Sequence, residues 1–166
     1  MDAKRNTQPD FVGSENVKKK HALQIEQFEH WATERNWDKF HNSHYDWWTF
    51  PIDKPSRLGY AYTVFDEEVE QLKSDPEFMR RYLRGVELLM LSWGWDLYGE
   101  RMIDNADVDQ MWHDWPIRLY KCGQSLKLFG CLDELSSVKK YGQILISEGA
   151  DFNFRGTDLK TPFLNL

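Results

Sequence analysis

The stretch PEFMRRYLRGVELLMLSWGWDLY, residues 76–98, carries the clearest structural pattern in the chain. Its large apolar side chains recur at steps of three and four residues, which is the spacing of one buried face of a helix. Pro76 suits the first turn of a helix, and Gly99 suits a helix end. We therefore predict a central, buried helix from Pro76 to about Tyr98. Its predicted inward face comprises Phe78, Tyr82, Val86, Leu89, Met90, Trp93 and Leu97.

The same spacing on either side of this stretch predicts further helices over residues 14–35, 37–48, 66–73, 116–129 and 133–148. Ser14, Asp66 and Asp133 are residue types that cap helix N-termini, and Pro116 suits a first turn. Only Tyr60–Phe65 has the composition of a strand. We predict an all-α fold, an irregular helical bundle with one long aromatic loop that contains Pro and Gly.

A chain of 166 residues is the usual size of one domain. Residues 1–13 are polar and contain Pro9 and Gly13, so we expect a tail or a strap there. Residues 14–148 form the predicted helical domain. Residues 149–166 have no clear period, but their phenylalanines predict that this C-terminal tail packs back onto the domain.

The net charge of −6 argues against a nucleic-acid partner, because such proteins usually present a basic face. No apolar run approaches the ~18 residues that a membrane span needs, and the polar N-terminus has no signal-peptide core. We therefore expect a cytoplasmic protein. A reducing compartment also agrees with two cysteines, Cys122 and Cys131, that we interpret as inert thiols.

Motifs for catalysis or for cofactor binding are missing from the sequence. It contains no nucleophile elbow, no phosphate-binding glycine loop and no zinc-protease motif. His41 and His44 are three residues apart and would share a helix face, with His30 or Asp38 as a third metal ligand. We interpret these histidines as surface or hydrogen-bonding groups, and we expect neither a metal nor a cofactor.

The densest aromatic stretch, WDKFHNSHYDWWTF over residues 37–50, holds more rings than one face of a short helix can bury. These rings either complete the core or line a groove for a ligand. Recognition sites combine aromatic walls with a few polar groups. The candidate ligand-binding residues are His44, Tyr45, Trp47, Trp48 and Phe50, with Arg118 and Lys121 as a polar edge and the loop at residues 52–63 as a flap.

Three blocks of the sequence are similar to one family. SHYDWWTFPID (43–53) contains Tyr45, Trp48, Phe50 and Pro51 of a His-x-Tyr-x-x-Trp-x-Phe-Pro pattern, although Ser43 stands at the histidine position. EEVEQLKSDPEFMRRYLRGVELLMLSWG (67–94) follows the family's acidic helix start, Lys-Ser break and long helix. YKCGQSLKLFGCL (120–132) matches at Leu126, Lys127, Gly130 and Leu132, but Gly123 and Ser125 replace a threonine and an isoleucine.

From about Gln27 to Ser147, the chain resembles the opioid growth factor receptor domain in the order and spacing of these blocks. The vertebrate member of that family is a receptor for the peptide Met-enkephalin and lies at the nucleus. The domain also occurs alone in microbes. The resemblance implies a binding role in general terms, and we carry over neither that peptide nor any catalytic residue.

We therefore predict a non-enzymatic binding or interaction domain with an aromatic groove for a peptide, a protein or a small ligand. The alternative is an uncharacterised enzyme with a cleft between residues 37–50 and 100–121. A set of His44, Asp114 and Lys121 around one cavity would favour the enzyme, whereas an aromatic groove without such a set would favour the binding domain.

The metal interpretation can be tested by elemental analysis of untagged protein that is purified without added metal. We expect well below one equivalent of zinc. Stoichiometric zinc that disappears when His41 and His44 are both replaced by Ala would contradict this interpretation.

Overall fold

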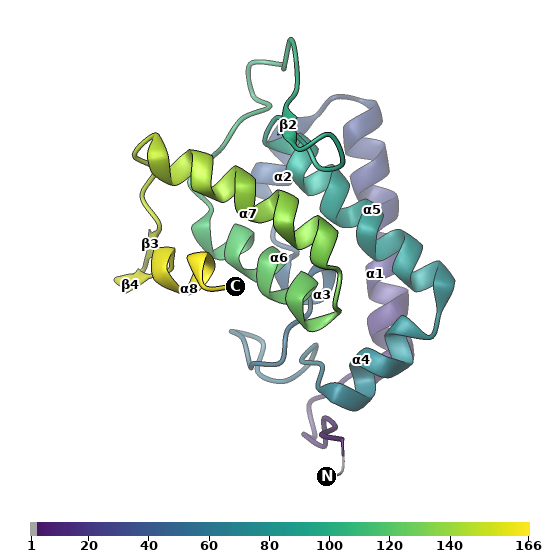
Figure 1. The fold of residues 1–166 in the computed structure, drawn as a ribbon. Helices are drawn as coiled ribbons and strands as arrows, with labels where there is room; N and C mark the ends of the chain where they lie inside the picture. The colour runs from purple at the N-terminus through teal and green to yellow at the C-terminus, as the bar shows by residue number, and fades with distance from the viewer. Residues whose placement is uncertain (1–2) are drawn as a thin grey trace.

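The computed structural model describes residues 3–166, and Figure 1 labels its helices and the strands β2, β3 and β4. The helices are α1 (Ser14–Thr33), α2 (Trp37–Asn42), α3 (Asp46–Thr49), α4 (Asp66–Lys73), α5 (Pro76–Ser92), α6 (Pro116–Leu128), α7 (Leu132–Ser147) and α8 (Lys160–Leu164). Two short antiparallel hairpins pair β1 (Trp95–Asp96) with β2 (Arg101–Met102) and β3 (Asn153–Phe154) with β4 (Thr157–Asp158). The predicted all-α class is confirmed.

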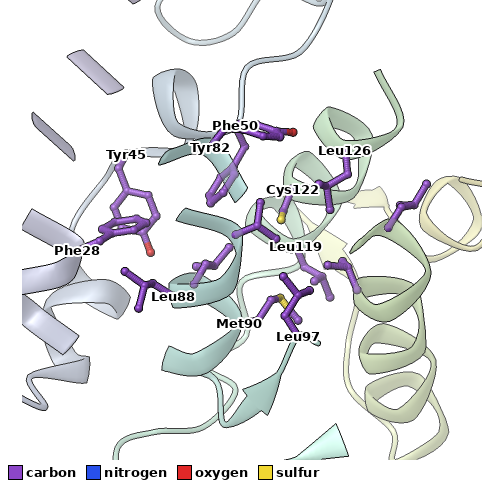
Figure 2. Packing of buried hydrophobic residues seen from close by; sticks show 14 of the residues in the cluster. Phe28, Tyr45, Phe50, Tyr82, Leu88, Met90, Leu97, Leu119, Cys122 and Leu126 are labelled. Atoms are coloured by element: carbon purple, nitrogen blue, oxygen red, sulfur yellow. The ribbon is translucent and has the colours of Figure 1, made fainter. Parts of the chain in front are cut away.

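The helices form two groups that share one core. Figure 1 shows α1, α4 and α5 together, with α1 packed along α5, and α6, α7 and α8 together on the other side. Figure 2 shows Met90 and Leu97 close to Leu119 of α6, at the place where the two groups meet. Elsewhere along α5, the hydroxyls of Tyr82 and Ser125 lie 2.7 Å apart and join α5 to α6.

The predicted central helix forms α5, and its inward face is buried as expected. Asp75 caps it, since its carboxylate accepts hydrogen bonds from the backbone N–H groups of Glu77 and Phe78. Tyr82, Val86 and Leu89 are fully buried. The predicted end is wrong, because α5 stops at Ser92 rather than near Tyr98, and Gly94 turns the chain at φ +79°.

Leu97 is buried even though it lies beyond the helix. Trp95 of β1 donates its indole N–H to the Ser137 hydroxyl at 3.0 Å, and that hydroxyl donates to the Leu97 carbonyl at 2.5 Å. Contacts with α7 therefore hold this segment in an extended form, in place of the further helical turn that the sequence predicts.

The predicted N-caps are displaced by one or two residues. Gly13 occupies the N-cap position of α1, and the Ser14 hydroxyl donates to Gln71 instead. Asp66 and Asp133 lie within the first turns of α4 and α7 rather than at their caps. Acidic side chains are favourable in a first turn because they face the positive end of the helix dipole.

The predicted strand at Tyr60–Phe65 is wrong, because these residues form turns and extended coil. Asn6, from the N-terminal segment, donates its side-chain amide to the carbonyls of Tyr60 and Thr63 at 3.0 and 2.8 Å. The backbone N–H of Asn6 also donates to Glu68 at 2.8 Å. The N-terminal segment therefore crosses this loop and hydrogen-bonds to two of its carbonyl groups, which are then not available for pairing with a neighbouring strand.

The C-terminal segment packs on α6 and α7. Phe163 of α8 is fully buried, and its ring lies directly over Gly142 of α7. The end of the Leu166 side chain lies close to Gly123 of α6. Gly142 permits a closer approach of the Phe163 ring than any larger residue would.

Among residues 3–166, no helix is both long enough and apolar enough to cross a membrane.

Leu89→Asp should unfold the domain. It would bury an unpaired carboxylate at a fully buried position, at a cost of several kcal/mol against a typical total stability of about 5–15 kcal/mol. Chemical denaturation followed by circular dichroism measures this effect. The matched control is Leu23→Asp, because Leu23 is 64% exposed and its replacement should change stability by less than about 0.5 kcal/mol. An unchanged unfolding midpoint for Leu89→Asp would show that α5 is not the core.

Candidate functional site

The aromatic stretch at residues 37–50 divides between the core and the surface. The predicted single helix is two helices, because the backbone is extended at Ser43 after α2. Tyr45 then turns inward, packs edge-on against Phe28 at 4.8 Å and donates its hydroxyl to the Phe40 carbonyl at 2.7 Å. Figure 2 shows Tyr45 beside Phe28.

Tyr45 and Phe50 therefore belong to the core, which corrects their assignment as groove walls. Their exposed fractions are 0% and 1%, so neither presents a surface to a ligand. The physical reason is the break between α2 and α3, which directs these two rings inward while Trp47 and Trp48 remain half-buried.

Arg118 also has a different place from the one predicted. It is 1% exposed, and its guanidinium donates to the Asp46 carboxylate at 2.8 Å and to the carbonyls of Phe40 and Ser43 at 2.7 and 2.9 Å. The rings of Tyr45 and Trp115 cover its faces, with centroids 4.4 and 4.7 Å from Cζ. Each of the three guanidinium nitrogens donates a hydrogen bond within the protein. Arg118 therefore holds α2 and α3 in place and has a structural role.

Trp48 faces α1 and also lies beside Trp47, with ring centroids 5.8 Å apart. Its indole N–H donates to Gln24 at 3.0 Å, and Lys20 Nζ lies 4.5 Å from its ring centroid. Tyr62 packs edge-on against it at 5.4 Å. Trp48 therefore joins the aromatic loop to α1.

The other three candidates, His44, Trp47 and Lys121, lie around one cavity of about 310 Å³. We call it the α3–α6 pocket, because α3 and α6 form its walls together with the loop at residues 54–59 and the β3–β4 hairpin. Its lining consists of His44, Asp46, Trp47, Arg57, Trp115, Ile117, Lys121, Phe154 and Arg155.

Lys121 is the most enclosed free cation of this lining. Burial lowers the pKa of its ammonium, and Arg118 lowers it further, whereas Asp46 opposes them. Its Nζ lies 5.6 Å from the centroid of Trp47. Within residues 3–166, no carboxylate lies within 4.0 Å of the cationic groups of Lys121, Arg57 or Arg155.

Sequence reasoning missed Arg57, Trp115, Ile117, Phe154 and Arg155. Arg57 lies in the loop that was predicted as a flap, and Phe154 in the tail that was expected to pack back. Arg155 and Gly156 have φ values of +50° and +82°, as in a tight two-residue hairpin turn, which turns this segment toward the pocket. No local pattern indicated that these segments meet.

The segment at residues 103–115 contacts α2 and the residues just before it. Asp107 accepts hydrogen bonds from Arg35 at 2.7 and 2.8 Å and from Trp37 at 2.8 Å. The ring of His113 stacks on His41 at 4.1 Å. Asp114 does not line the α3–α6 pocket, so the set of His44, Asp114 and Lys121 is not brought together.

His41 and His44 do not share a helix face, because α2 ends at Asn42. His41 bonds to the Asp109 carbonyl at 2.8 Å, and burial lowers its pKa. His44 lies 6.3 Å from both Trp47 and Trp115. In the part of the chain that the structure describes, no three His, Cys, Asp or Glu side chains are close enough to hold a metal ion.

The cysteines offer no activated nucleophile. Cys122 is fully buried, and burial raises the pKa of its thiol well above the ordinary value. Burial likewise raises the pKa of Cys131. Thiolates are the reactive form, so both residues are poor candidates for thiol chemistry.

A sequence model of the opioid growth factor receptor (OGFr) conserved region matches residues 3–123. The match begins earlier than the resemblance at Gln27–Ser147 and contains the first two sequence blocks, but it covers only the start of the third. No curated protein and no solved structure matches the chain.

Arg118→Met should destabilise the domain by about 3–5 kcal/mol, because it leaves Asp46 buried without its partner and exposes two carbonyls to an apolar side chain. Chemical denaturation measures the change. Arg101→Met is the matched control, because Arg101 is exposed and only 3.8 Å from Asp104, a surface pair worth about 0–1 kcal/mol. Equal unfolding midpoints for the two variants would contradict a supporting role for Arg118.

Proposed function

The chain belongs to the opioid growth factor receptor conserved-region family, and from that premise we propose that it is a non-enzymatic binding domain whose ligand enters the α3–α6 pocket. The observation that carries this proposal is the gathering of three aromatic walls, Trp47, Trp115 and Phe154, around a cavity whose free cations have no carboxylate within 4.0 Å among residues 3–166. Pockets that bind ligands typically combine aromatic surface with a few convergent polar groups.

The rival interpretation as an enzyme has less support from the same pocket. Its one carboxylate, Asp46, already accepts from the buried Arg118 guanidinium. His44 is exposed and lies near Trp47 and Trp115, without a hydrogen-bonded partner among the described residues to orient it. General acid–base catalysis is favoured by titratable groups that hydrogen-bonded partners orient, and among the described residues the pocket lining holds His44 without such a partner.

The size of the cavity bears on the kind of ligand. At about 310 Å³ it is at the small end of the roughly 300–1,000 Å³ of ligand pockets. One small molecule, or one end of a peptide, would fill it. We infer a cytosolic setting for this binding, in keeping with two unpaired cysteines.

Native mass spectrometry of protein purified from its own host tests the proposal. We expect a retained mass increment that is lost from Trp47→Ala. The matched control is Trp48→Ala, the neighbouring tryptophan that faces α1, which should keep the increment. Melting temperatures of both variants show that each is folded.

The proposal fails if the wild-type protein carries no increment, or if folded Trp47→Ala retains it as fully as Trp48→Ala. A ligand that is released as a chemically altered product during incubation would support the enzyme instead.

A further inference from the structure

We propose that the ligand of the α3–α6 pocket is a small aromatic molecule with a doubly charged anionic group of the phosphate monoester type. This inference rests on the proposed binding function and specifies the chemistry of its ligand. The anion would lie among Arg57, Lys121 and Arg155, and the flat ring would lie against the indoles of Trp47 and Trp115.

The first argument is charge. Arg57, Lys121 and Arg155 contribute three positive charges to the lining, and Asp46 contributes the one carboxylate. The buried Arg118 guanidinium bonds to that carboxylate at 2.8 Å and compensates its charge. The chain as a whole has a net charge of −6, so this group of cations is not part of a generally basic surface.

The second argument is the cost of enclosing Lys121. Its ammonium is held beside Trp47 and close to the like charge of Arg118, and burial lowers its pKa. A structural lysine in such a place usually has an ion-pair partner, and none lies within 4.0 Å in residues 3–166. A bound anion would supply that partner.

The third argument is the arrangement of the rings. The imidazole of His44 lies 6.3 Å from the indoles of Trp47 and of Trp115, at interplanar angles of 39° and 88°. Both indoles therefore lie near His44, and Phe154 of the hairpin lines the same pocket. Aromatic surfaces of this kind bind flat rings through stacked or edge-on contacts.

The donor set favours a phosphate over a carboxylate. Two guanidinium groups and one ammonium offer more N–H donors than the two oxygens of a carboxylate can accept, whereas a phosphate monoester presents three oxygens and about two negative charges. Arginine pairs with phosphate through parallel, charge-assisted hydrogen bonds. The cavity of about 310 Å³ suits one ring and one such group rather than a polymer.

Phenyl phosphate is the probe for this proposal, with benzoate, phenol and inorganic phosphate as comparisons. Isothermal titration gives the affinities, and indole N–H signals in heteronuclear NMR spectra report the place of binding. We expect phenyl phosphate to bind about tenfold more tightly than benzoate, as one additional charge-assisted contact predicts. It should shift the signals of Trp47 and Trp115 more than that of Trp48, which does not line the pocket but lies 5.8 Å from Trp47.

Variants of the cations locate the anion. Lys121→Gln and Arg155→Gln should each weaken phenyl phosphate binding about tenfold. Lys127→Gln is the matched control, an exposed lysine on the same helix α6, and should leave the affinity unchanged. Binding should also weaken with added salt, because the pocket is open to solvent on one side.

Several outcomes would overturn the inference. If benzoate or phenol binds as tightly as phenyl phosphate, the ligand does not need a doubly charged group. If Lys121→Gln and Lys127→Gln have equal effects, the anion does not bind in the α3–α6 pocket. Failure of all four probes to shift Trp47 and Trp115 would also overturn it. An uncharged ligand retained in native mass spectrometry would defeat this inference alone, whereas the absence of any retained ligand would defeat the proposed function as well.

Discussion

The guanidinium of Arg118 is the contact on which the aromatic half of the molecule depends. One side chain of α6 closes the carbonyl end of α2, neutralises Asp46 of α3 and fills the space between two aromatic rings. A helix end leaves carbonyls without partners, and burying them unpaired is costly. Five N–H donors in a rigid planar fork meet that need, which a flexible ammonium would meet poorly.

This contact also sets the geometry of the α3–α6 pocket. Because Asp46 is held from the core side, α3 presents the next residue, Trp47, to the pocket while Tyr45 points inward. Lys121 stands on the same helix as Arg118 but faces the cavity. The buried Arg118 thus has a structural role, whereas Lys121 is free to contact a ligand. Residue type alone does not reveal this difference.

Small residues of α6 and α7 have particular roles in packing. Ser125 places a hydroxyl 2.7 Å from that of Tyr82 in the core. Gly123 makes room for Leu166, and Gly142 makes room for Phe163. The C-terminal segment therefore packs against α6 and α7 through positions that lack a side chain, and this same segment carries Phe154 and Arg155 to the pocket.

Local features of this protein could be predicted from its residues: the buried face of α5, the start of α6 at Pro116 and the all-α class. These follow from spacing and backbone preference within a few turns of chain. The C-terminal end of α5 and the break at Ser43 depended on distant partners such as Ser137 and Arg118. Only the tertiary structure decided that Tyr45 belongs to the core and Trp47 to the surface, and that the segments lining the α3–α6 pocket meet. The reason is that packing between segments determines which rings and cations are buried, and their order along the chain does not.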